Sequence, residues 1–475
     1  MKVRIVGAGP AGLYLAILLK RTDPAADVEL LERNAAEDTF GFGVVFSDET
    51  LEAVEAADPA TYAEIAGHFA HWAEIDVHHR GNVVTSGGHG FSALSRHTLL
   101  AILQQRAEAL GARLRFGVEA GPDDLAGADL IVGADGVNSM VRRARADAFG
   151  PELDHRVAKY AWFGTDLVFD AFKFFIAETE HGVFQVHGYP YSDAMSTFIV
   201  ETSEDTWRRA GLDRTDPATL GPGESDEHAL AFGEELFADV LEGHRLIGNR
   251  SRFINFVTVR NRAWRHGNVV LLGDAAHTAH FSIGSGTKLA LEDAIGLAWA
   301  VREHPGDVDG ALAAYEAERK PLVASTQRAA QGSLEWFEGI ARYVDEPSRL
   351  FAFNLLTRSR RITYGELQLR DPGFVAAVDA EFARARGALP ARGDGHPDDP
   401  PPPMFTPIRL RGLELPNRVV VSPMDMYSCE DGTPGDFHLV HLGARGLGGA
   451  ALVMTEMICV SREGRITPGC GGLYK

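Results

Sequence analysis

Apolar residues in this chain first form short uninterrupted runs, separated by segments of helical character. The runs predict buried strands at Met1–Val6, Val28–Glu32, Leu130–Gly133 and Asn268–Leu272. Helices are predicted between and after these strands, at Leu13–Lys20, Arg96–Gly111 and Lys288–Val301. Strands that alternate with helices in this way are typical of an α/β fold.

A second pattern, in which polar and apolar residues alternate, occupies residues 46–92 and 155–257. Such alternation predicts half-buried strands, most clearly at Phe172–Ile176, Gly182–Val186 and Thr197–Glu201. Residues 331–385, which follow the last predicted helix, are expected to be helical.

The chain has one clear seam, at residues 386–403, where Pro, Gly, Asp and Arg dominate and little can be buried. This composition predicts an extended linker that is semi-rigid where the prolines cluster. Apolar strands begin again in residues 404–475. We therefore expect one catalytic unit over residues 1–385 and a separate segment after the linker.

The first predicted strand leads into a glycine pattern at Gly7, Gly9 and Gly12. Glycines at these positions allow a tight turn and let the backbone approach a pyrophosphate, which then lies at the N-terminus of the following helix. Glu32 ends the second strand, where a carboxylate can accept hydrogen bonds from an adenosine ribose. Together these features predict a dinucleotide site.

Two later segments indicate which dinucleotide to expect. Asp274 follows an apolar strand. A second glycine-rich helix start comes after it, with Gly284, Gly286 and Thr287. An FAD extended across the domain needs such a second anchor for its ribityl chain and flavin ring, whereas NAD does not. A turn at Asp135-Gly136 lies between the two anchors in the chain. The predicted cofactor is therefore FAD.

These three segments, in this order, resemble those of the single-component FAD-dependent aromatic hydroxylases, over about the first 385 residues. The resemblance implies a Rossmann-like FAD-binding domain with an inserted antiparallel-sheet substrate domain. The FAD-binding parts would be residues 1–45, 93–154 and 258–330. The substrate sheet would comprise residues 46–92 and 155–257, with a helical end at 331–385.

The resemblance also implies roles for individual residues. Asp274 would bind the ribityl hydroxyls, and Arg96 would contact the region between the ribityl chain and the pyrophosphate. Backbone N–H groups near Gly286 would stabilise charge at the flavin N1–C2 carbonyl. The expected cofactor-binding set is completed by Arg33 and Asp135. His280 and Phe281 would face the flavin as catalytic candidates. His187 and Tyr189 would line the substrate pocket.

Four strings narrow the resemblance further: Gly41–Asp48, Ser86–Phe91, Glu178–Gly182 and His277–Leu289. They are similar to a branch of the family that hydroxylates salicylyl-CoA and 2-aminobenzoyl-CoA. The branch implies hydroxylation of an aryl-CoA thioester at ring carbon C5 with O2 and NADH or NADPH, through a flavin C4a-hydroperoxide that an electron-rich ring attacks.

The segment after the linker resembles the start of the old yellow enzyme family, at Phe405–Leu410, Leu415–Met424 and Asp436–Leu442. Those proteins are FMN-binding (β/α)8 barrels that reduce activated alkenes with NAD(P)H. Ser422, Pro423 and Met424 match the segment whose backbone meets FMN. A barrel needs about 250 residues, so residues 404–475 would form only an incomplete (β/α)8 fragment. We expect FMN not to bind and the reductase step to be absent, whether the segment is a fragment or a truncated gene product.

The fused segment favours 2-aminobenzoyl-CoA as the substrate, because salicylyl-CoA 5-hydroxylases are expected to end before the linker. A salicylyl-CoA 5-hydroxylase remains an alternative. So do a flavin dehydrogenase or oxidase that does not hydroxylate, and a non-catalytic flavoprotein scaffold.

Composition limits the remaining partners. The net charge of −20 argues against nucleic acid, because phosphate binding needs clustered Lys and Arg. No uninterrupted apolar stretch approaches the roughly 18 residues of a membrane span, so a cytoplasmic protein is expected. The three cysteines, at 429, 459 and 470, match no zinc spacing, and no metal is predicted. A homodimer and a separate reductase polypeptide are the protein partners considered, beside the aryl-CoA substrate and O2.

Overall fold

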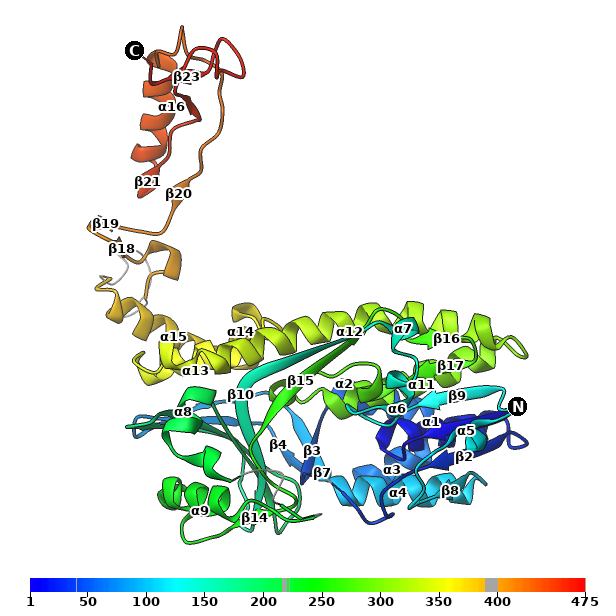
Figure 1. The fold of residues 1–475 in the computed structure, drawn as a ribbon. Coiled ribbons are helices and arrows are strands. Elements are labelled where there is room, and N and C mark those ends of the chain that lie inside the picture. Colours follow the sequence, from blue (N-terminus) through cyan, green and yellow to red (C-terminus); the bar gives the residue numbers. More distant parts are fainter. Residues whose placement is uncertain (40, 216–219, 222, 389–399, 475) are drawn as a thin grey trace. The chain divides into compact units, whose positions relative to one another are not determined.

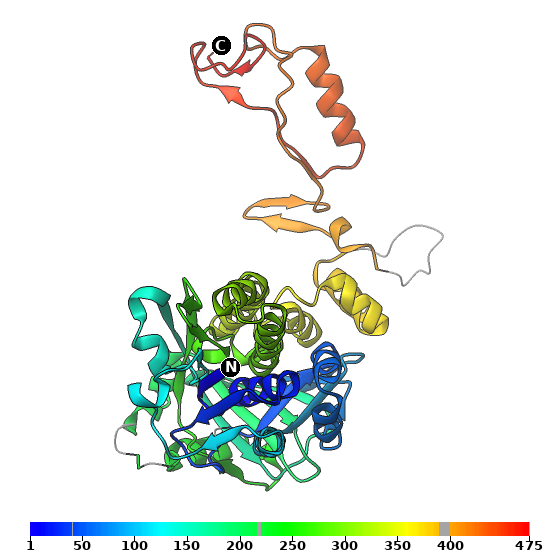
Figure 2. The ribbon, with the colours of Figure 1, turned by 90° about the vertical axis from the view of Figure 1, so that its right-hand side faces the viewer.

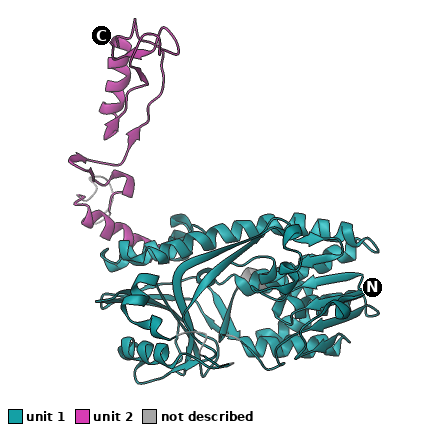
Figure 3. Ribbon diagram, in the orientation of Figure 1, with its two compact units in different colours: residues 1–371 teal, residues 372–475 magenta. Residues whose placement is uncertain are grey.

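The computed structural model describes residues 1–39, 41–215, 220–221, 223–388 and 400–474. It divides into two compact units, residues 1–371 and 372–475 (Figure 3). Helix α15 (Pro372–Ala385), which the sequence analysis placed in the catalytic unit, therefore belongs to the second unit. Residues 389–399 of the predicted linker lie outside the described residues. Across the described residues, no helix combines the length and apolar character needed to span a membrane.

One half of the first unit is built on a six-stranded sheet, seen on the right of that unit near the N-terminus (Figure 1). Its strand order is β16 (Arg265–His266), β17 (Val269–Leu271), β9 (Leu130–Gly133), β1 (Lys2–Val6), β2 (Asp27–Leu31) and β8 (Arg113–Arg115). All neighbours pair in parallel except β16 and β17. The central strands are almost completely buried, as the uninterrupted apolar runs predicted.

Helices pack beside this sheet and carry the glycine-rich turns. Helix α1 (Pro10–Thr22) packs against α4 (Arg96–Ala109) and α11 (Gly286–Glu303), and α11 packs against α12 (Val308–Glu338) (Figure 2). Helix α12 is 31 residues long and contacts both β10 of the second large sheet and β16 of the parallel sheet. This helix therefore connects the two layers of the first unit.

The second large sheet has eight strands and is mainly antiparallel. Its order is β14 (Leu246–Gly248), β10 (Pro151–Thr165), β13 (Ser196–Thr202), β12 (Gly182–Pro190), β11 (Phe172–Thr179), β5 (Ile75–His79) and β6 (Asn82–Ser86), with β15 (Ile254–Asn261) paired to β10. Only β5 and β11 run parallel. The three strands predicted from alternation correspond to β11, β12 and β13, so the expected α/β fold with an inserted antiparallel sheet is confirmed.

Part of the stretch predicted as half-buried strands is helical instead. Helices α2 (Asp48–Ala57) and α3 (Pro59–Ala66) occupy the start of residues 46–92. Leu51 and Val54, three positions apart, are both buried, so the apolar spacing there follows a helix rather than a strand. Helices also interrupt residues 155–257, at α8 (Glu204–Arg209), α9 (Glu227–Leu236) and α10 (Ala238–Leu241).

The rest of the first unit consists of smaller elements. A three-stranded sheet contains β3 (Gly43–Ser47), β7 (Phe91–Ser95) and β4 (Ala70–Trp72). The remaining α-helices are α5 (Pro122–Leu125), α6 (Met140–Arg143), α7 (Ala146–Phe149), α13 (Ser348–Thr357) and α14 (Tyr364–Arg370). The 3-10 turns are η1 (Leu212–Arg214), η3 (Gly273–Ala275), η4 (Phe281–Ile283) and η5 (Ile340–Arg342).

The second unit is built from short elements. After α15 come η6 (Pro403–Phe405), β18 (Ile408–Leu410), β19 (Leu413–Leu415), β20 (Val420–Val421), α16 (Asp436–Leu447), β21 (Leu452–Val453), β22 (Ile458–Cys459) and β23 (Gly471–Gly472). Strands β20 and β21 are parallel, with α16 between them in the chain. Several apolar side chains remain largely exposed on this unit, among them Leu439 at 75%, Leu447 at 92% and Val460 at 82%.

We predict that Gly12→Ala destabilises the first unit, while Gly9→Ala does not. A Cβ at Gly12 would lie 2.2 Å from the carbonyl oxygen of Gly7, whereas no atom lies within 4 Å of a Cβ at Gly9. Overpacking of this kind costs about 1–3 kcal/mol. Calorimetry of the two variants of the full chain should show a lower unfolding temperature for Gly12→Ala only. Equal temperatures would contradict the packing argument.

Candidate cofactor and substrate site

A cavity of about 1140 Å³ opens where strands β1, β2 and β9 of the parallel sheet end. Residues that follow these strands line it, among them Gly7, Glu32 and Asp135. The carboxyl ends of parallel strands are where open α/β sheets bind their ligands. This volume exceeds the roughly 300–1,000 Å³ of ordinary small-molecule pockets, so a long ligand fits it better than a compact one.

The glycine turn approaches its surroundings very closely. Gly7 has φ +106°, in the region that favours glycine, and a Cβ there would lie 2.3 Å from the carbonyl oxygen of Ala134. Gly12 packs against Gly7 in the same way, while Gly9 faces open space. Gly9 directly precedes α1, so a ligand at this point meets unobstructed backbone at a helix N-terminus.

Glu32 lies beside this turn, as the spacing predicted. Its Oε2 accepts a hydrogen bond from the Ala8 N–H at 3.0 Å, and its Oε1 accepts from the Asn34 N–H at 2.9 Å. The carboxylate thus joins the turn to the end of β2. Arg33, the next residue, is exposed and also lines the cavity.

Arg96 and Asp274 place opposite charges in the cavity wall. Within the described residues, the Arg96 guanidinium makes no hydrogen bond and no ion pair. Asp274 is surrounded by protein but open to the cavity. Desolvation raises the pKa of its carboxyl, opposed by His277 and Arg96. Desolvation likewise lowers the pKa of Arg96, opposed by Asp274. A cation without a protein partner here fits an anionic ligand group.

Asp135 has a structural role in addition to lining the cavity. Its carboxylate accepts hydrogen bonds from the Ser139 hydroxyl at 2.5 Å and from the N–H groups of Met140 and Val141 at 2.6 and 3.2 Å. These donors lie at the start of α6. Asp135 therefore anchors this helix start against the cavity wall.

The second glycine-rich segment forms the start of α11, as predicted. Gly284 has φ +64° and ends η4, and a Cβ at Gly286 would meet no atom within 4 Å. Gly284, Gly286 and Thr287 are not among the described residues that line the cavity. The Ser285 hydroxyl between them is buried and has no hydrogen-bond partner among the described residues. An orphaned hydroxyl at a helix start is a feature that a bound polar group would resolve.

These observations together test whether FAD fits. The long cavity, the open backbone at Gly9, the carboxylate of Glu32 and the unpaired Arg96 suit a ribose and a pyrophosphate. A second, partly unsatisfied helix start at Ser285 suits a distant polar group of the same ligand. The residues present therefore fit an extended dinucleotide such as FAD.

The two catalytic candidates lie deeper, behind the cavity wall. Phe281 packs between Tyr160, which lines the cavity, and His280, with ring centroids 4.7 and 4.1 Å away. His280 is 2% exposed, and burial lowers its pKa to about 4. His187 is also buried, with its ring 5.4 Å from that of Phe281. The sequence-predicted His280, Phe281 and His187 thus meet in one cluster.

Tyr189 lies on the same strand as His187, β12, but makes different contacts. Its hydroxyl donates to the Gly43 carbonyl oxygen at 3.1 Å, and its ring stacks near Trp72 and Phe172 at centroid distances of 6.1 and 5.4 Å. The hydroxyl is therefore engaged by the backbone of β3.

Sequence reasoning missed Glu201, which joins the two histidines. It lies on β13 with 0% exposure, and its Oε2 is 3.0 Å from the Nε2 of His187. The available signal was an acidic residue at the end of an otherwise apolar predicted strand, Thr197–Glu201. Burial raises the pKa of the Glu201 carboxyl.

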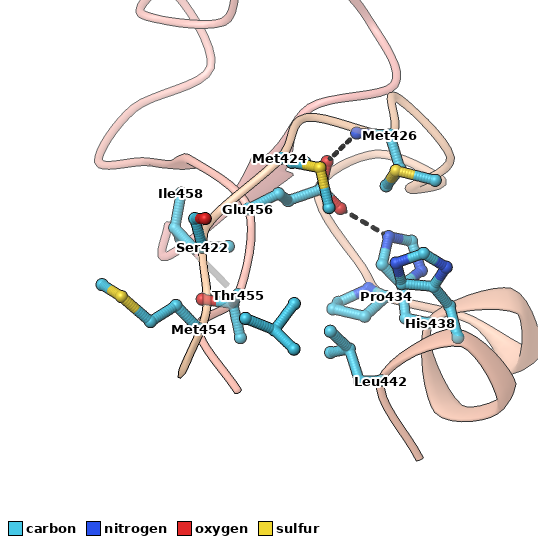
Figure 4. A pocket seen from close by; sticks show the side chains of 12 residues that line it. Ser422, Met424, Met426, Pro434, His438, Leu442, Met454, Thr455, Glu456 and Ile458 are labelled. Carbon is cyan, nitrogen blue, oxygen red and sulfur yellow. Dashed lines mark hydrogen bonds and ion pairs between the residues drawn. The ribbon is translucent and has the colours of Figure 1, made fainter. Parts of the chain in front are cut away.

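In the second unit, Ser422 and Met424 line a cavity of only about 50 Å³, while Pro423 lies beside it in the chain (Figure 4). His438 Nε2 lies 2.6 Å from Glu456 Oε1 and 3.4 Å from the sulfur of Cys429. The Gly435 N–H donates to His438 Nδ1 at 3.2 Å, so Nε2 carries the proton and directs it toward the carboxylate. In this tautomer the group is a hydrogen-bonded cluster and not a ready metal site.

Comparison with known proteins places the two parts of the chain in different families. The sequence model described as FAD binding domain matches residues 1–330. The model of the NADH:flavin oxidoreductase / NADH oxidase family matches residues 403–475. The second match is partial: an NADH:flavin oxidoreductase, FG08077, from Gibberella zeae is 44% identical over 72 residues, which cover 17% of its length.

Two relatives extend over most of the chain. A salicyloyl-CoA 5-hydroxylase from a Streptomyces species is 47% identical over 437 residues, covering 91% of this chain and 81% of the relative. A 3-hydroxy-4-methyl-anthranilyl-[aryl-carrier protein] 5-monooxygenase from Streptosporangium sibiricum is 37% identical, covering 79% of this chain and 99% of the relative.

The first of these relatives corrects one expectation. The linker begins at residue 386 of 475, so a match over 91% of the chain must continue past it. A salicyloyl-CoA 5-hydroxylase therefore does not end before the linker. The second segment consequently does not separate salicyloyl-CoA from 2-aminobenzoyl-CoA as the substrate.

Solved structures share the fold of the first unit. A 2-methyl-3-hydroxypyridine-5-carboxylic acid oxygenase has a TM-score of 0.58 at 21% identity, covering 78% of this chain and 96% of that one. PqsL from Pseudomonas aeruginosa has a TM-score of 0.56 at 21% identity, covering 72% and 98%. With most of its length matched by the FAD binding domain model and by two named hydroxylases, the chain belongs to the FAD-dependent aromatic monooxygenase family.

Proposed function

We propose that this enzyme hydroxylates C5 of a benzoyl-CoA thioester that carries a hydroxyl or amino group ortho to the thioester carbonyl. The activities for which the two relatives are named carry this proposal: both are 5-hydroxylases or 5-monooxygenases of a benzoyl group with such an ortho donor, held on CoA or a carrier protein. C5 is para to the ortho donor and is therefore electron-rich. A single chemical preference accounts for both activities.

We place salicyloyl-CoA first among the substrates and 2-aminobenzoyl-CoA second. The 47% identical relative acts on salicyloyl-CoA. The argument for 2-aminobenzoyl-CoA depended on the second segment, which that relative shares in part. The amino substrate remains a candidate because the second relative is named for an anthranilyl group.

We assign the chain's residues as follows. The open backbone at Gly9, the Glu32 carboxylate and the Arg96 guanidinium would hold the dinucleotide part of FAD, and Asp274 its ribityl chain. FAD, when bound, supplies the activation of O2 with electrons from NADH or NADPH. In the net reaction the aryl thioester, O2, NAD(P)H and one proton give the hydroxylated thioester, NAD(P)⁺ and water.

The aromatic wall behind the cavity would exclude water from the reacting ring. Phe281 contacts Tyr160 and Trp162 on the cavity side and His187 on the other, at centroid distances of 4.7, 6.0 and 5.4 Å. A dry site protects an oxygen-activating flavin from unproductive reaction with water. We therefore propose that the ring of the substrate lies beside Phe281.

The substrate assignment predicts labelled oxygen in the product. The purified chain, supplied with FAD, NADH or NADPH and ¹⁸O2, should place one labelled atom at C5 of salicyloyl-CoA, as measured by mass spectrometry of the hydrolysed acid. 2-Aminobenzoyl-CoA and benzoyl-CoA are the comparison substrates, and benzoyl-CoA should not react because it lacks the donor. NAD(P)H oxidation without labelled product from either ortho-substituted thioester would contradict the proposal. It would favour a dehydrogenase, an oxidase or a scaffold.

The same preparation tests the cofactor content. Extracted flavin should be FAD without FMN, because the cavity of about 50 Å³ beside Ser422 holds little more than one water molecule. Stoichiometric FMN in the extract would show that the second unit binds flavin.

The role proposed for Arg96 predicts a loss of FAD affinity. Arg96→Met removes the unpartnered cation in the cavity and should raise the FAD dissociation constant about tenfold or more, because a charge-assisted contact contributes about 1.5–3 kcal/mol. Flavin fluorescence titration measures this constant. Arg328→Met, which changes an exposed arginine on α12, is the matched control. Equal constants in the two variants would remove Arg96 from the cofactor site.

A further inference from the structure

Behind Phe281, a series of hydrogen bonds links a half-buried arginine to the buried carboxylate of Glu201. The Arg358 Nε–H donates to the Ser333 hydroxyl oxygen at 2.8 Å, and the hydroxyls of Ser333 and Ser282 are 2.7 Å apart. The Ser282 hydroxyl lies 2.8 Å from His280 Nδ1. His280 Nε2 lies 3.5 Å from Glu201 Oε1. This series of hydrogen bonds thus crosses from the C-terminal end of α13 and from α12 through the η4 turn to β13.

The guanidinium of Arg358 determines which group donates and which accepts in each of these hydrogen bonds. Arginine only donates, so the Ser333 oxygen must accept from it. Within the described residues, Ser282 is the other partner of the Ser333 hydroxyl, so the Ser333 proton points to Ser282. The Ser282 proton then points to His280 Nδ1. The reverse order would leave the fully buried Ser333 with a proton that nothing accepts.

A backbone contact supports the same direction independently. The Ser282 N–H also points to His280 Nδ1, at 3.4 Å, so that nitrogen is an acceptor. His280 therefore carries its proton on Nε2, the atom that faces Glu201. His187 Nε2 lies 3.0 Å from the other oxygen of Glu201. The imidazoles of His280 and His187, and the more distant guanidinium of Arg358, thus favour the ionised form of the Glu201 carboxylate.

Some polar atoms around Glu201 nevertheless lack hydrogen bonds. His280 Nε2 and Glu201 Oε1 are both buried, yet neither has a hydrogen-bond partner among the described residues despite their 3.5 Å separation. The side-chain oxygen of Gln185, directly opposite Glu201 in the β12–β13 register, is also unpartnered. The Gln185 amide lowers the pKa of the Glu201 carboxyl through a side-chain hydrogen bond, and His280 Nε2 lies 3.5 Å from Oε1, so this oxygen is weakly held and can accept a further donor.

Glu201 also lies next to the cavity wall. In the register of β10 and β13 it stands directly opposite Tyr160, whose side chain lines the cofactor cavity. Phe281 packs on that tyrosine and on His280. A substrate ring beside Phe281 would lie on the side of the wall where Tyr160 stands opposite Glu201, whose own side chain is 0% exposed and is not among the described residues that line the cavity.

We propose that Glu201 accepts the proton of the substrate's ortho-hydroxyl group, and that Arg358, acting through Ser333, Ser282 and His280, is the positioning residue that holds this carboxylate ready. The inference rests on the proposed function and identifies its preferred substrate class as 2-hydroxybenzoyl thioesters. The O–H bond breaks, its electron pair stays on the ring oxygen, and the proton passes to Glu201 Oε1. The phenolate then donates electron density to C5, para to it. This step consumes no oxidant, and O2 and NAD(P)H serve only the hydroxylation.

An amino group needs no such base, because its neutral lone pair already activates C5. Glu201→Gln should therefore lower kcat/KM for hydroxylation of salicyloyl-CoA about 100-fold or more, the usual effect of removing a general base. For 2-aminobenzoyl-CoA the same variant should lose less than about fivefold. A purely structural role for Glu201 would affect both substrates equally, and that result would overturn the inference.

Controls separate this inference from the proposed function. Asp58→Asn removes another fully buried carboxylate, which pairs with Arg21 and Arg106, and should leave the ratio of the two substrates unchanged. A wild-type chain that hydroxylates only 2-aminobenzoyl-CoA would overturn the role of Glu201 while the proposed function stands. A wild-type chain inactive with both thioesters would refute the proposed function itself.

The role of Arg358 predicts a shift in the pH profile. The groups that face Glu201 and His280 are His187 on β12, Tyr160 and Arg156 on β10, Glu338 on α12 and Arg358 directly after α13. Arg156 is paired with Glu338 at 2.5 Å, so Arg358 is the cation that these neighbours leave unneutralised. Its positive charge lowers the pKa of the Glu201 carboxyl, so its removal raises that pKa.

The acid limb of kcat/KM against pH for salicyloyl-CoA should therefore move to higher pH in Arg358→Met. Ser333→Ala, which interrupts the chain with a smaller change, should move it in the same direction if the larger variant folds poorly. Arg361→Met alters a nearby exposed arginine that donates to Ser325, and should leave the limb in place. Reduced activity with an unmoved limb in both Arg358→Met and Ser333→Ala would overturn the positioning role.

Discussion

The close contact between Gly7 and the backbone of Ala134 is the constraint on which the cofactor end of this enzyme depends. It brings the end of β1 against the end of β9 at a distance that no side chain allows. Gly12 repeats the contact one turn later, against Gly7 itself. Because α1 can then start directly beside the sheet, the backbone at Gly9 stays open and Glu32 of the neighbouring strand reaches the turn. The cavity is the space that these contacts leave.

Local sequence patterns predicted the parts of the structure that depend on neighbours along the chain. Continuous apolar runs identified β1, β9 and β17, because parallel strands covered on both faces have no polar side. The glycine spacing and Glu32 identified the turn, because its geometry is set within a few residues. Residues 48–66 were misread as strands because alternation over a few positions overlaps with helical spacing, and only burial at Leu51 and Val54 distinguishes them.

The buried polar chain could not be predicted in this way, because it is formed by distant parts of the sequence. Arg358 follows α13, Ser333 lies in α12, His280 precedes η4 and Glu201 lies in β13. Their meeting depends on the register of β13 against β12 and on the packing of α12 over the large sheet. A sequence pattern can single out His280 in a loop, but not the carboxylate that faces its Nε2 from a strand about 80 residues earlier.

Arg358 and Arg96 are both desolvated cations, and their charges are compensated in opposite ways. Arg358 is fully engaged: it donates to Ser333 and to the carbonyl oxygens of Ser282 and Leu355, and its guanidinium lies 4.8 Å from the ring of Phe337. Arg96 has no protein partner among the described residues and is turned to the cavity. A desolvated charge is stable only when something compensates it. The protein compensates Arg358 from within, whereas in the proposed FAD site the charge of Arg96 would be compensated by an anionic group of the cofactor. In the proposed function, Arg96 in the cavity wall would thus serve ligand binding, while Arg358, which is not among the described residues that line the cavity, would organise the buried residues around Glu201.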